Sequence, residues 1–150
     1  MTNPLARYRS AQRAARALFA SFTEEHCPTC ATPCCRKPVR VRPVDIILVQ
    51  ELGYSLPGRE QAPASAATAL ADAALAMRPE QEGAPCEFLG SRGCAFPDDL
   101  RPLGCAAFIC QPMRRELPAG ELAVIEAAVA DLERAYEALA RDLEKLPVLP

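Results

Sequence analysis

The sequence has no tryptophan, few other aromatic residues and a single histidine. Its formal net charge is −2, so no excess of positive charge attracts the chain to nucleic acid or to an anionic membrane. No apolar run approaches the ~18 residues of a membrane span, and residues 1–22 lack the continuous apolar segment of a secretory signal. We therefore expect a cytoplasmic protein with no membrane contact.

Several motifs of common enzymes are also missing. The chain has no glycine-rich phosphate loop, no dinucleotide-binding fingerprint and no serine nucleophile elbow. We therefore expect no ordinary catalytic site, and the function has to be sought in what the chain does contain.

Alanine and leucine are abundant, which favours helices packed through small and aliphatic side chains. A globular chain of 150 residues buries roughly 68–70% of its unfolded surface, enough for one self-sufficient core. We predict a mainly α, single-domain fold over residues 1–150, in which metal clamps two cysteine-rich irregular segments and a long C-terminal helix packs on the N-terminal helix. Its parts are an N-terminal helix in residues 1–26, a cysteine-cluster region in residues 27–110 and a C-terminal helix in residues 116–146.

Residues 1–26 carry the signals of a helix. Asn3 can cap it, and Pro4 suits the first helical position. Apolar residues then recur three and four apart, at Leu5, Tyr8, Ala11, Ala15, Leu18 and Phe22. The stretch is also rich in arginine and lacks acidic residues before Glu24, as a mitochondrial presequence would. We favour the helix, because the apolar stripe gives the stretch a structural use.

The C-terminal segment has the most regular pattern in the chain. Its apolar residues are Leu122, Ile125, Val129, Leu132, Tyr136, Leu139, Leu143 and Leu146. Small flanking residues, Ala128, Ala135 and Ala140, favour packing on the chain's own helices over a homodimeric coiled coil. We expect a monomer, with a homodimer through this helix as the alternative. Antiparallel packing would set the arginines of the first helix against the acids of the last: Arg7, Arg9, Arg13 and Arg16 against Asp131, Glu133, Glu137 and Asp142.

Two shorter helices are predicted between these. Pro43 begins one of them and Gly53 follows its end, while residues 64–77 form the other. Asp45 lies in the first turn of the helix that starts at Pro43, where a carboxylate favours the helix dipole.

Eight cysteines fall into two blocks, Cys27, Cys30, Cys34 and Cys35, then Cys86, Cys94, Cys105 and Cys110. Disulfides are rare in the cytosol, so the absence of an export signal disfavours a disulfide framework. A thioredoxin-like redox pair at Cys27 and Cys30 would need a βαβ context that the sequence lacks. Glycines and prolines interrupt the second block, so we expect metal ligation to hold it in place.

The order of these residues resembles the YkgJ-like cysteine-cluster family, described as a zinc- or iron-chelating domain. The matching residues are Cys27, Cys30, Cys34 and Cys35, then Cys86, Phe88, Leu89, Gly93, Cys94, Arg101, Pro102, Cys105 and Cys110. Three residues separate Cys30 from Cys34 where the family's name implies two, and Ala106 stands where a basic residue is usual. The resemblance implies metal binding by cysteines, and some relatives are described as flagellin lysine methylases.

The spacing of the thiols supports metal ligation independently. A C-x2-C turn brings two thiolates to one metal, with Zn–S distances of about 2.3 Å, and two such pairs complete a tetrahedron. Successive side chains point to opposite sides of an extended segment, so Cys34 and Cys35 suggest two neighbouring sites or one cluster of several metals. Two Zn²⁺ ions, each held by four cysteines, use every thiol, and we favour them over iron or one [4Fe–4S] cluster, which leaves four thiols spare. We expect at least one site to draw on both blocks.

Charge offers a further expectation. Eight thiolates with two Zn²⁺ ions would take the formal charge from −2 to about −6, and basic neighbours should offset it. The arginines and lysine that flank cysteines are Arg36, Lys37, Arg40, Arg42, Arg92, Arg101, Arg114 and Arg115. A solvated basic strip is the plainest alternative. A nucleic-acid surface is disfavoured, because aromatic residues are not interleaved with these bases.

Three other polar residues are weaker candidates for a site. His26 is expected near the metal but not among its ligands, because Cys27 competes for the same geometry. Asp98 and Asp99 are expected to be turn residues. The sequence as a whole predicts a metal-binding protein whose metal is structural or chelated, with a redox or methylation-linked iron–sulfur protein as the alternative.

Overall fold

The computed structural model describes residues 3–31, 41–57, 86–91 and 93–144. Its elements, in chain order, are α1 (Pro4–His26), the 3₁₀ turn η1 (Cys27–Thr29), α2 (Pro43–Glu51), β1 (Leu89–Gly90), β2 (Gly93–Cys94), α4 (Leu103–Ala106), α5 (Gln111–Glu116) and α6 (Ala119–Glu144). The predicted mainly α fold is confirmed. The helix predicted at 64–77 lies outside the described residues, and no helix in the described part is long and apolar enough to cross a membrane.

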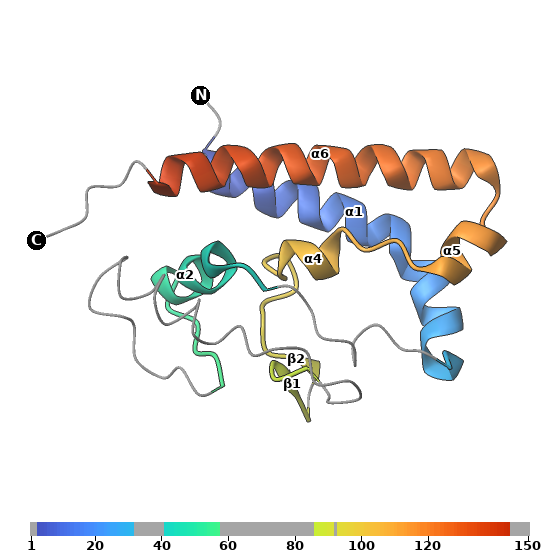
Figure 1. Cartoon of the computed structure of the whole chain (residues 1–150), viewed down its shortest axis with the longest axis horizontal. Helices are drawn as coiled ribbons and strands as arrows, with labels where there is room; N and C mark the ends of the chain where they lie inside the picture. Colours follow the sequence, from blue (N-terminus) through green and yellow to red (C-terminus); the bar gives the residue numbers. More distant parts are fainter. Residues whose placement is uncertain (1–2, 32–40, 58–85, 92, 145–150) are drawn as a thin grey trace, which may run out of the picture.

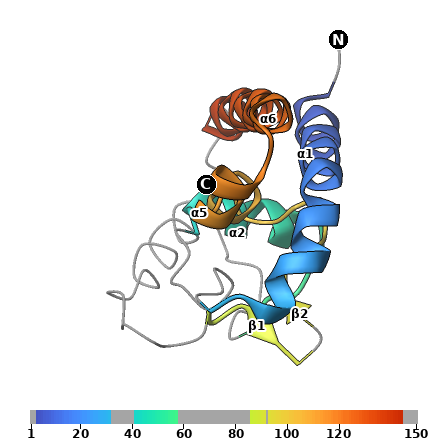
Figure 2. The ribbon, with the colours of Figure 1, turned by 90° about the vertical axis from the view of Figure 1, so that its right-hand side faces the viewer.

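The two long helices, α1 and α6, pack against each other and run in opposite directions (Figure 1). The shorter elements α2, α4 and α5 and the β1–β2 hairpin all lie on one side of this pair, as two views agree (Figures 1 and 2). The packing of the C-terminal helix on the N-terminal helix is therefore confirmed.

Helix α1 begins as its sequence predicts. The Asn3 side-chain Oδ1 accepts a hydrogen bond from the Leu5 N–H at 2.9 Å, and Pro4 takes the first helical position. The buried residues of the helix are Tyr8, Ala11, Gln12, Ala15, Phe19 and Phe22. The predicted stripe was wrong at one position, because Phe19 packs inside while Leu18 is 38% exposed.

The C-terminal helix is shorter than predicted at its start. Leu117 adopts an extended backbone before Pro118, because the proline ring disfavours helical geometry in the residue that precedes it. Residues 111–116 therefore form α5, and α6 starts at Ala119. Within α6, the predicted apolar residues from Ile125 to Leu139 are buried, and Ala135 is fully buried among them.

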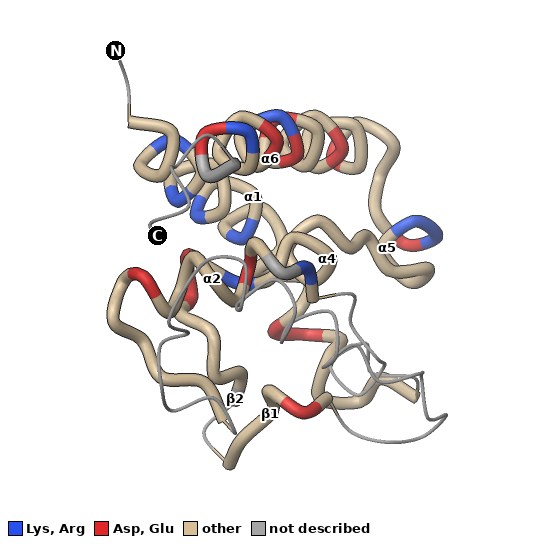
Figure 3. Tube along the Cα trace, turned by 60° about the vertical axis from the view of Figure 1, so that its left-hand side comes forward, with Lys and Arg blue, Asp and Glu red and all other residues tan. Residues whose placement is uncertain are grey.

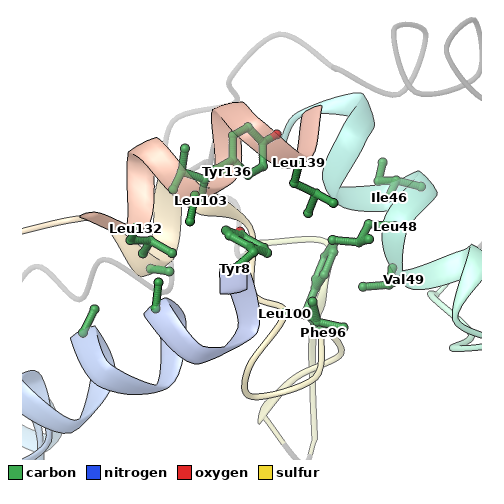
Figure 4. Close-up of a cluster of buried hydrophobic side chains, with 14 of the residues drawn as sticks. Tyr8, Ile46, Leu48, Val49, Phe96, Leu100, Leu103, Leu132, Tyr136 and Leu139 are labelled. Carbon is green, nitrogen blue, oxygen red and sulfur yellow. The ribbon is translucent and has the colours of Figure 1, made fainter. Parts of the chain in front are cut away.

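A main core cluster joins α1, α2, α4, α6 and the loop before α4. Side chains from all of these segments point toward one another in Figure 4, with Tyr8 of α1 near Tyr136 of α6 at a ring-centroid distance of 5.5 Å. A second cluster, consisting of Phe19, Phe22, Ile109, Met113, Ile125 and Val129, continues the core towards α5. The core therefore extends along most of the α1–α6 interface.

The expected ion pairs between α1 and α6 were mostly wrong. Arginine positions recur along α1 (Figure 3), but among the described residues only Arg7 forms an ion pair with a predicted acid, Asp131, at 3.5 Å. Arg9 and Arg13 bind Asp99 instead, each at 2.8 Å, and Arg16 binds Asp98 at 3.1 Å. The turn at 98–99 carries its two carboxylates to α1, and this long-range contact leaves no periodic signal in the sequence.

Candidate metal centre

A short hairpin positions two cysteines of the second block. Strand β1 pairs antiparallel with β2, with Leu89 opposite Cys94. The Leu89 N–H donates to the Cys86 carbonyl at 3.0 Å, and the Ala95 N–H donates to the Phe88 carbonyl at 2.8 Å. These hydrogen bonds fold the chain back on itself, so Cys86 and Cys94 come to neighbouring positions.

Two phenylalanines fix this hairpin to the main core. The rings of Phe88 and Phe96 meet edge to face, with centroids 5.0 Å apart, and both side chains are buried. Cys86 and Cys94 pack, partly buried, against the same core. The thiols are therefore held at the edge of the hydrophobic core and not on a freely exposed loop.

Buried side chains from two helices hold the segment that carries Cys105. Gln12 of α1 accepts from the Arg101 N–H at 3.0 Å and donates to the Arg101 carbonyl at 2.6 Å. Asp45 of α2 accepts from the Leu103 N–H at 3.4 Å. Because backbone groups on both sides of Pro102 are bound in this way, the start of α4 has a defined position, and Cys105 lies within that helix.

The three thiols of Cys86, Cys94 and Cys105 affect one another. Burial is the largest cause that raises the pKa of Cys105 to about 12, and the neighbouring Cys94 and Cys86 are the next largest. The pKa of Cys86 is raised by burial first and by Cys94 among the smaller causes. Negative charge on one of these thiols therefore opposes negative charge on the others, and a bound cation would relieve that opposition.

Cys110 lies apart from these three. It directly precedes α5 and packs against the second core cluster beside Ile109 and Met113. The sequence grouped it with the other cysteines of the second block, but the structure places it in a different part of the core.

The first block is only partly described. Cys27 and Cys30 bracket the turn η1, in which the Cys30 N–H donates to the Cys27 carbonyl at 3.3 Å. Cys27 is exposed and Cys30 half-buried, while Cys34 and Cys35 lie outside the described residues.

The residues that the structure describes contain no group of three or more Cys, His, Asp or Glu side chains arranged to hold a metal ion. Convergence of the two cysteine blocks on one site therefore stays a prediction. Within the described residues, the only strands form a two-residue antiparallel hairpin, so the parallel βαβ setting of a thioredoxin-like pair is not seen there.

His26 is engaged in contacts of its own. Its Nε2 lies 2.7 Å from Glu116 of α5, and its Nδ1 lies 3.0 Å from the Phe22 carbonyl. The imidazole also stacks on the Phe22 ring at 3.9 Å. With both ring nitrogens beside oxygens, His26 ties α1 to α5, in a position next to Cys27.

The basic residues near the cysteines have individual contacts. The Arg42 guanidinium lies over the Tyr136 ring at 5.3 Å, Arg101 binds Asp98 at 2.8 Å and Arg114 binds Glu126 at 3.1 Å. Arg115 is exposed, and Arg36, Lys37, Arg40 and Arg92 lie outside the described residues. Arg101 lowers the pKa of Cys105, against the larger effects of burial and of the neighbouring thiols.

The sequence analysis did not identify Gln12 as a buried residue, and it gave Asp45 only an interaction with the dipole of α2. Gln12 is fully buried and Asp45 is 3% exposed. The signal for Gln12 is its position beside Ala11 and Ala15, on the apolar face of a helix, where a glutamine needs buried hydrogen-bond partners. Asp45 caps α2 by accepting from the Arg42 N–H at 2.7 Å, and its second oxygen binds α4.

Comparison with models of protein families, with curated proteins and with solved structures found no match to this chain. The resemblance to the cysteine-cluster family therefore rests on the matching residues of the sequence, chiefly the order of the eight cysteines and the Arg101–Pro102 pair.

Proposed function

We propose that the chain is a metal-binding cysteine-cluster protein with thiolate coordination, in which Cys86, Cys94 and Cys105 are ligands of one metal ion. The observation that carries the proposal is that Cys86 and Cys94 pack, partly buried, against the main core, to which α4, the helix that contains Cys105, also contributes. The three cysteines lie in the turn before β1, in strand β2 and in helix α4.

The chemistry of the donors favours a soft or borderline cation. Free thiols crowded at the edge of a hydrophobic core oppose one another's ionisation, whereas a metal ion holds them as thiolates and releases their protons. Thiolates select zinc or iron–sulfur clusters over magnesium or calcium.

Zinc is the metal we favour, in two sites that use all eight cysteines. The fourth ligand of the site with Cys86, Cys94 and Cys105 would come from the first block, and Cys110 would belong to the second site. An iron–sulfur centre with a redox or methylation-linked role is the alternative.

The setting proposed for this function is a reducing one. Cys30, Cys86, Cys94, Cys105 and Cys110 are free thiols in the structure, as cytoplasmic metal ligands are before metal binds. We infer a cytoplasmic monomer whose partner is the metal ion, with no nucleic acid or membrane surface involved.

Paired substitutions in α4 test the assignment. Cys105→Ser removes a proposed ligand, whereas Leu103→Ala removes buried apolar surface from the same short helix and should cost roughly 2–5 kcal/mol of stability. Zinc bound per chain should fall in Cys105→Ser and stay at the wild-type level in folded Leu103→Ala. Equal zinc content in Cys105→Ser and the wild type would contradict the proposal, and loss of zinc in both variants would assign the effect to the fold of α4.

A further inference from the structure

A surface group of four arginines contacts the turn at residues 98–99. Three of them lie on α1, where basic positions recur along the helix (Figure 3), and the fourth follows the turn. Each of the two carboxylates of the turn binds two guanidinium groups, so the group retains two positive charges in excess. Its basic members, which we call the arginine face, are Arg9, Arg13, Arg16 and Arg101.

Asp99 holds two of these guanidinium groups in place. Arg9 donates to both carboxylate oxygens, from Nε at 2.8 Å and from Nη2 at 3.1 Å, and Arg13 donates from Nη1 at 2.8 Å. A guanidinium has more N–H donors than one carboxylate occupies. The Arg13 side chain is 60% exposed, so the donors that Asp99 does not use are open to solvent.

Asp98 holds the other two guanidinium groups. Its Oδ1 lies 3.1 Å from Arg16 Nη1 and accepts a hydrogen bond from Arg101 Nη2 at 2.8 Å. The four groups are therefore oriented before any partner binds, which reduces the side-chain entropy that is lost when a further carboxylate is bound.

The spacing along α1 places three of the arginines in a row. Arg9, Arg13 and Arg16 are four and three residues apart, so they lie on one side of the helix. With a rise of about 1.5 Å per residue, they span about 10 Å of the helix axis. The apolar residues that α1 buries lie on a different side, and the row is accessible to a partner.

We propose that the arginine face binds an acidic segment of a partner protein, a helix whose aspartates or glutamates recur three and four residues apart. Carboxylates on such a helix repeat the spacing of the arginines on α1. Guanidinium groups match carboxylates in geometry and charge, and the arginine face already binds the two carboxylates of Asp98 and Asp99. This binding is independent of the proposed metal site.

Two features favour an acidic protein segment over a nucleic acid. The chain has a formal net charge of −2, which opposes the approach of a long polyanion. Asp98 and Asp99 also lie among the arginines, where they repel a backbone that carries a phosphate at every nucleotide. A peptide can place uncharged side chains opposite these two aspartates.

Fluorescence anisotropy with a synthetic peptide tests the proposal. The probe is a fluorescein-labelled, alanine-based helical peptide with glutamates four and three residues apart, and the same peptide with glutamines is its control. The full chain should bind the glutamate peptide and not the glutamine peptide. Arg13→Gln combined with Arg16→Gln should raise the dissociation constant of the glutamate peptide about 5–30-fold, because two exposed charge pairs are lost.

Arg134→Gln combined with Arg141→Gln is the matched control. It removes the same charge from two arginines that lie exposed on α6. This double variant should bind the glutamate peptide nearly as tightly as the wild type does.

Asp98→Asn tests the arginine face in the opposite direction. The Asp98 side chain is 82% exposed, and it competes with a partner's carboxylate for Arg16 and Arg101. Its replacement should lower the dissociation constant of the glutamate peptide about 2–5-fold, which loss of folding could not do.

The results that would overturn the proposal differ in what they assign. Equal weakening in both double variants would make net charge the cause, and wild-type affinity in folded Arg13→Gln/Arg16→Gln would remove these arginines from the interface. Tighter binding of a labelled thymidine oligonucleotide, lost in the same variant, would assign the face to nucleic acid. A wild-type dimer in sedimentation that this variant dissociates would assign it to a second copy of the chain.

Urea unfolding shows which variants are folded. Where Arg13→Gln/Arg16→Gln is not folded, Asp98→Asn decides, and unchanged or weaker binding of the glutamate peptide by this variant would overturn the proposal. None of these results bears on metal binding by the cysteines.

Discussion

The Gln12 side-chain amide forms two hydrogen bonds with the backbone of Arg101, accepting from its N–H at 3.0 Å and donating to its carbonyl at 2.6 Å. The same Nε2 also lies 2.8 Å from the Tyr8 hydroxyl. Through this buried amide, the N-terminal helix holds the segment that leads into Cys105.

Gln12→Leu should therefore destabilise the protein strongly. The substitution leaves the Arg101 N–H and carbonyl without their partner inside the core, and buried unsatisfied groups cost about 1–3 kcal/mol each. We expect the free energy of unfolding of the metal-free protein, measured in urea, to fall by roughly 2–4 kcal/mol. Gln111→Leu, on the exposed surface of α5, should change it by less than about 0.5 kcal/mol. Similar small effects in both variants would contradict the importance of the buried amide.

Asp99 should stabilise the fold in a manner that depends on pH. The Arg9 side chain binds it through two hydrogen bonds, at 2.8 and 3.1 Å, and the pKa of Asp99 is lowered by this interaction first. The pKa of Asp99 in the folded state lies below the unfolded value of 3.8. The ionised carboxylate therefore stabilises the folded state above about pH 4, and this stabilisation is lost as the pH falls through the folded pKa.

Asp99→Asn should lower the free energy of unfolding by about 1 kcal/mol at neutral pH. The difference from the wild type should shrink at about pH 3, where the wild-type carboxyl also loses its charge. Asp131→Asn, at an exposed pair with Arg7, should have an effect of less than about 0.5 kcal/mol. A constant difference between Asp99→Asn and the wild type across this range would show that charge is not the cause.

Asp45 should have the opposite pH dependence. Burial raises its pKa to about 6, against the hydrogen bonds from the Arg42 and Leu103 N–H groups. The folded chain therefore binds a proton at Asp45 more tightly than the unfolded chain does. The resulting stabilisation of the folded state is complete below about pH 4 and is lost as the pH rises through about 6.

Comparison with Asp45→Asn isolates this effect. The free energy of unfolding of metal-free wild type, minus that of Asp45→Asn, should fall by up to about 3 kcal/mol between about pH 4 and pH 7, because asparagine does not titrate. The measurement is urea unfolding at several pH values, with Asp131→Asn as the exposed control. A difference that rises with pH would show that the folded state prefers the ionised carboxylate.

The sequence predicted the long helices because their signals are local. The Asn3–Pro4 start of α1 and the apolar repeat from Ile125 to Leu139 both depend on residues a few positions apart. The break between α5 and α6 was also encoded locally, by Pro118, but the predicted helix was started before it, at residue 116. Helix periodicity therefore gave the right elements and a wrong boundary.

Contacts between distant segments could not be predicted from such local patterns. Asp99 follows the rules of a turn residue, and nothing in its neighbourhood shows that Arg9 of α1 would bind it. Gln12 is polar by composition, yet it is fully buried because the Arg101 backbone supplies its partners. The packing of Cys86 and Cys94 against the main core, and of Cys110 against the second cluster, likewise depends on the tertiary fold, since the spacing of the cysteines does not distinguish them.

Metal analysis of the anaerobically purified full chain, together with its visible spectrum, tests the central claim most directly. A cysteine-cluster protein that uses all eight thiols for zinc should contain about two zinc ions per chain and be colourless. A brown protein with about four iron atoms and acid-labile sulfide would show that the centre is an iron–sulfur cluster and not zinc. A chain that is folded, reduced and free of bound metal would contradict the metal-binding account itself.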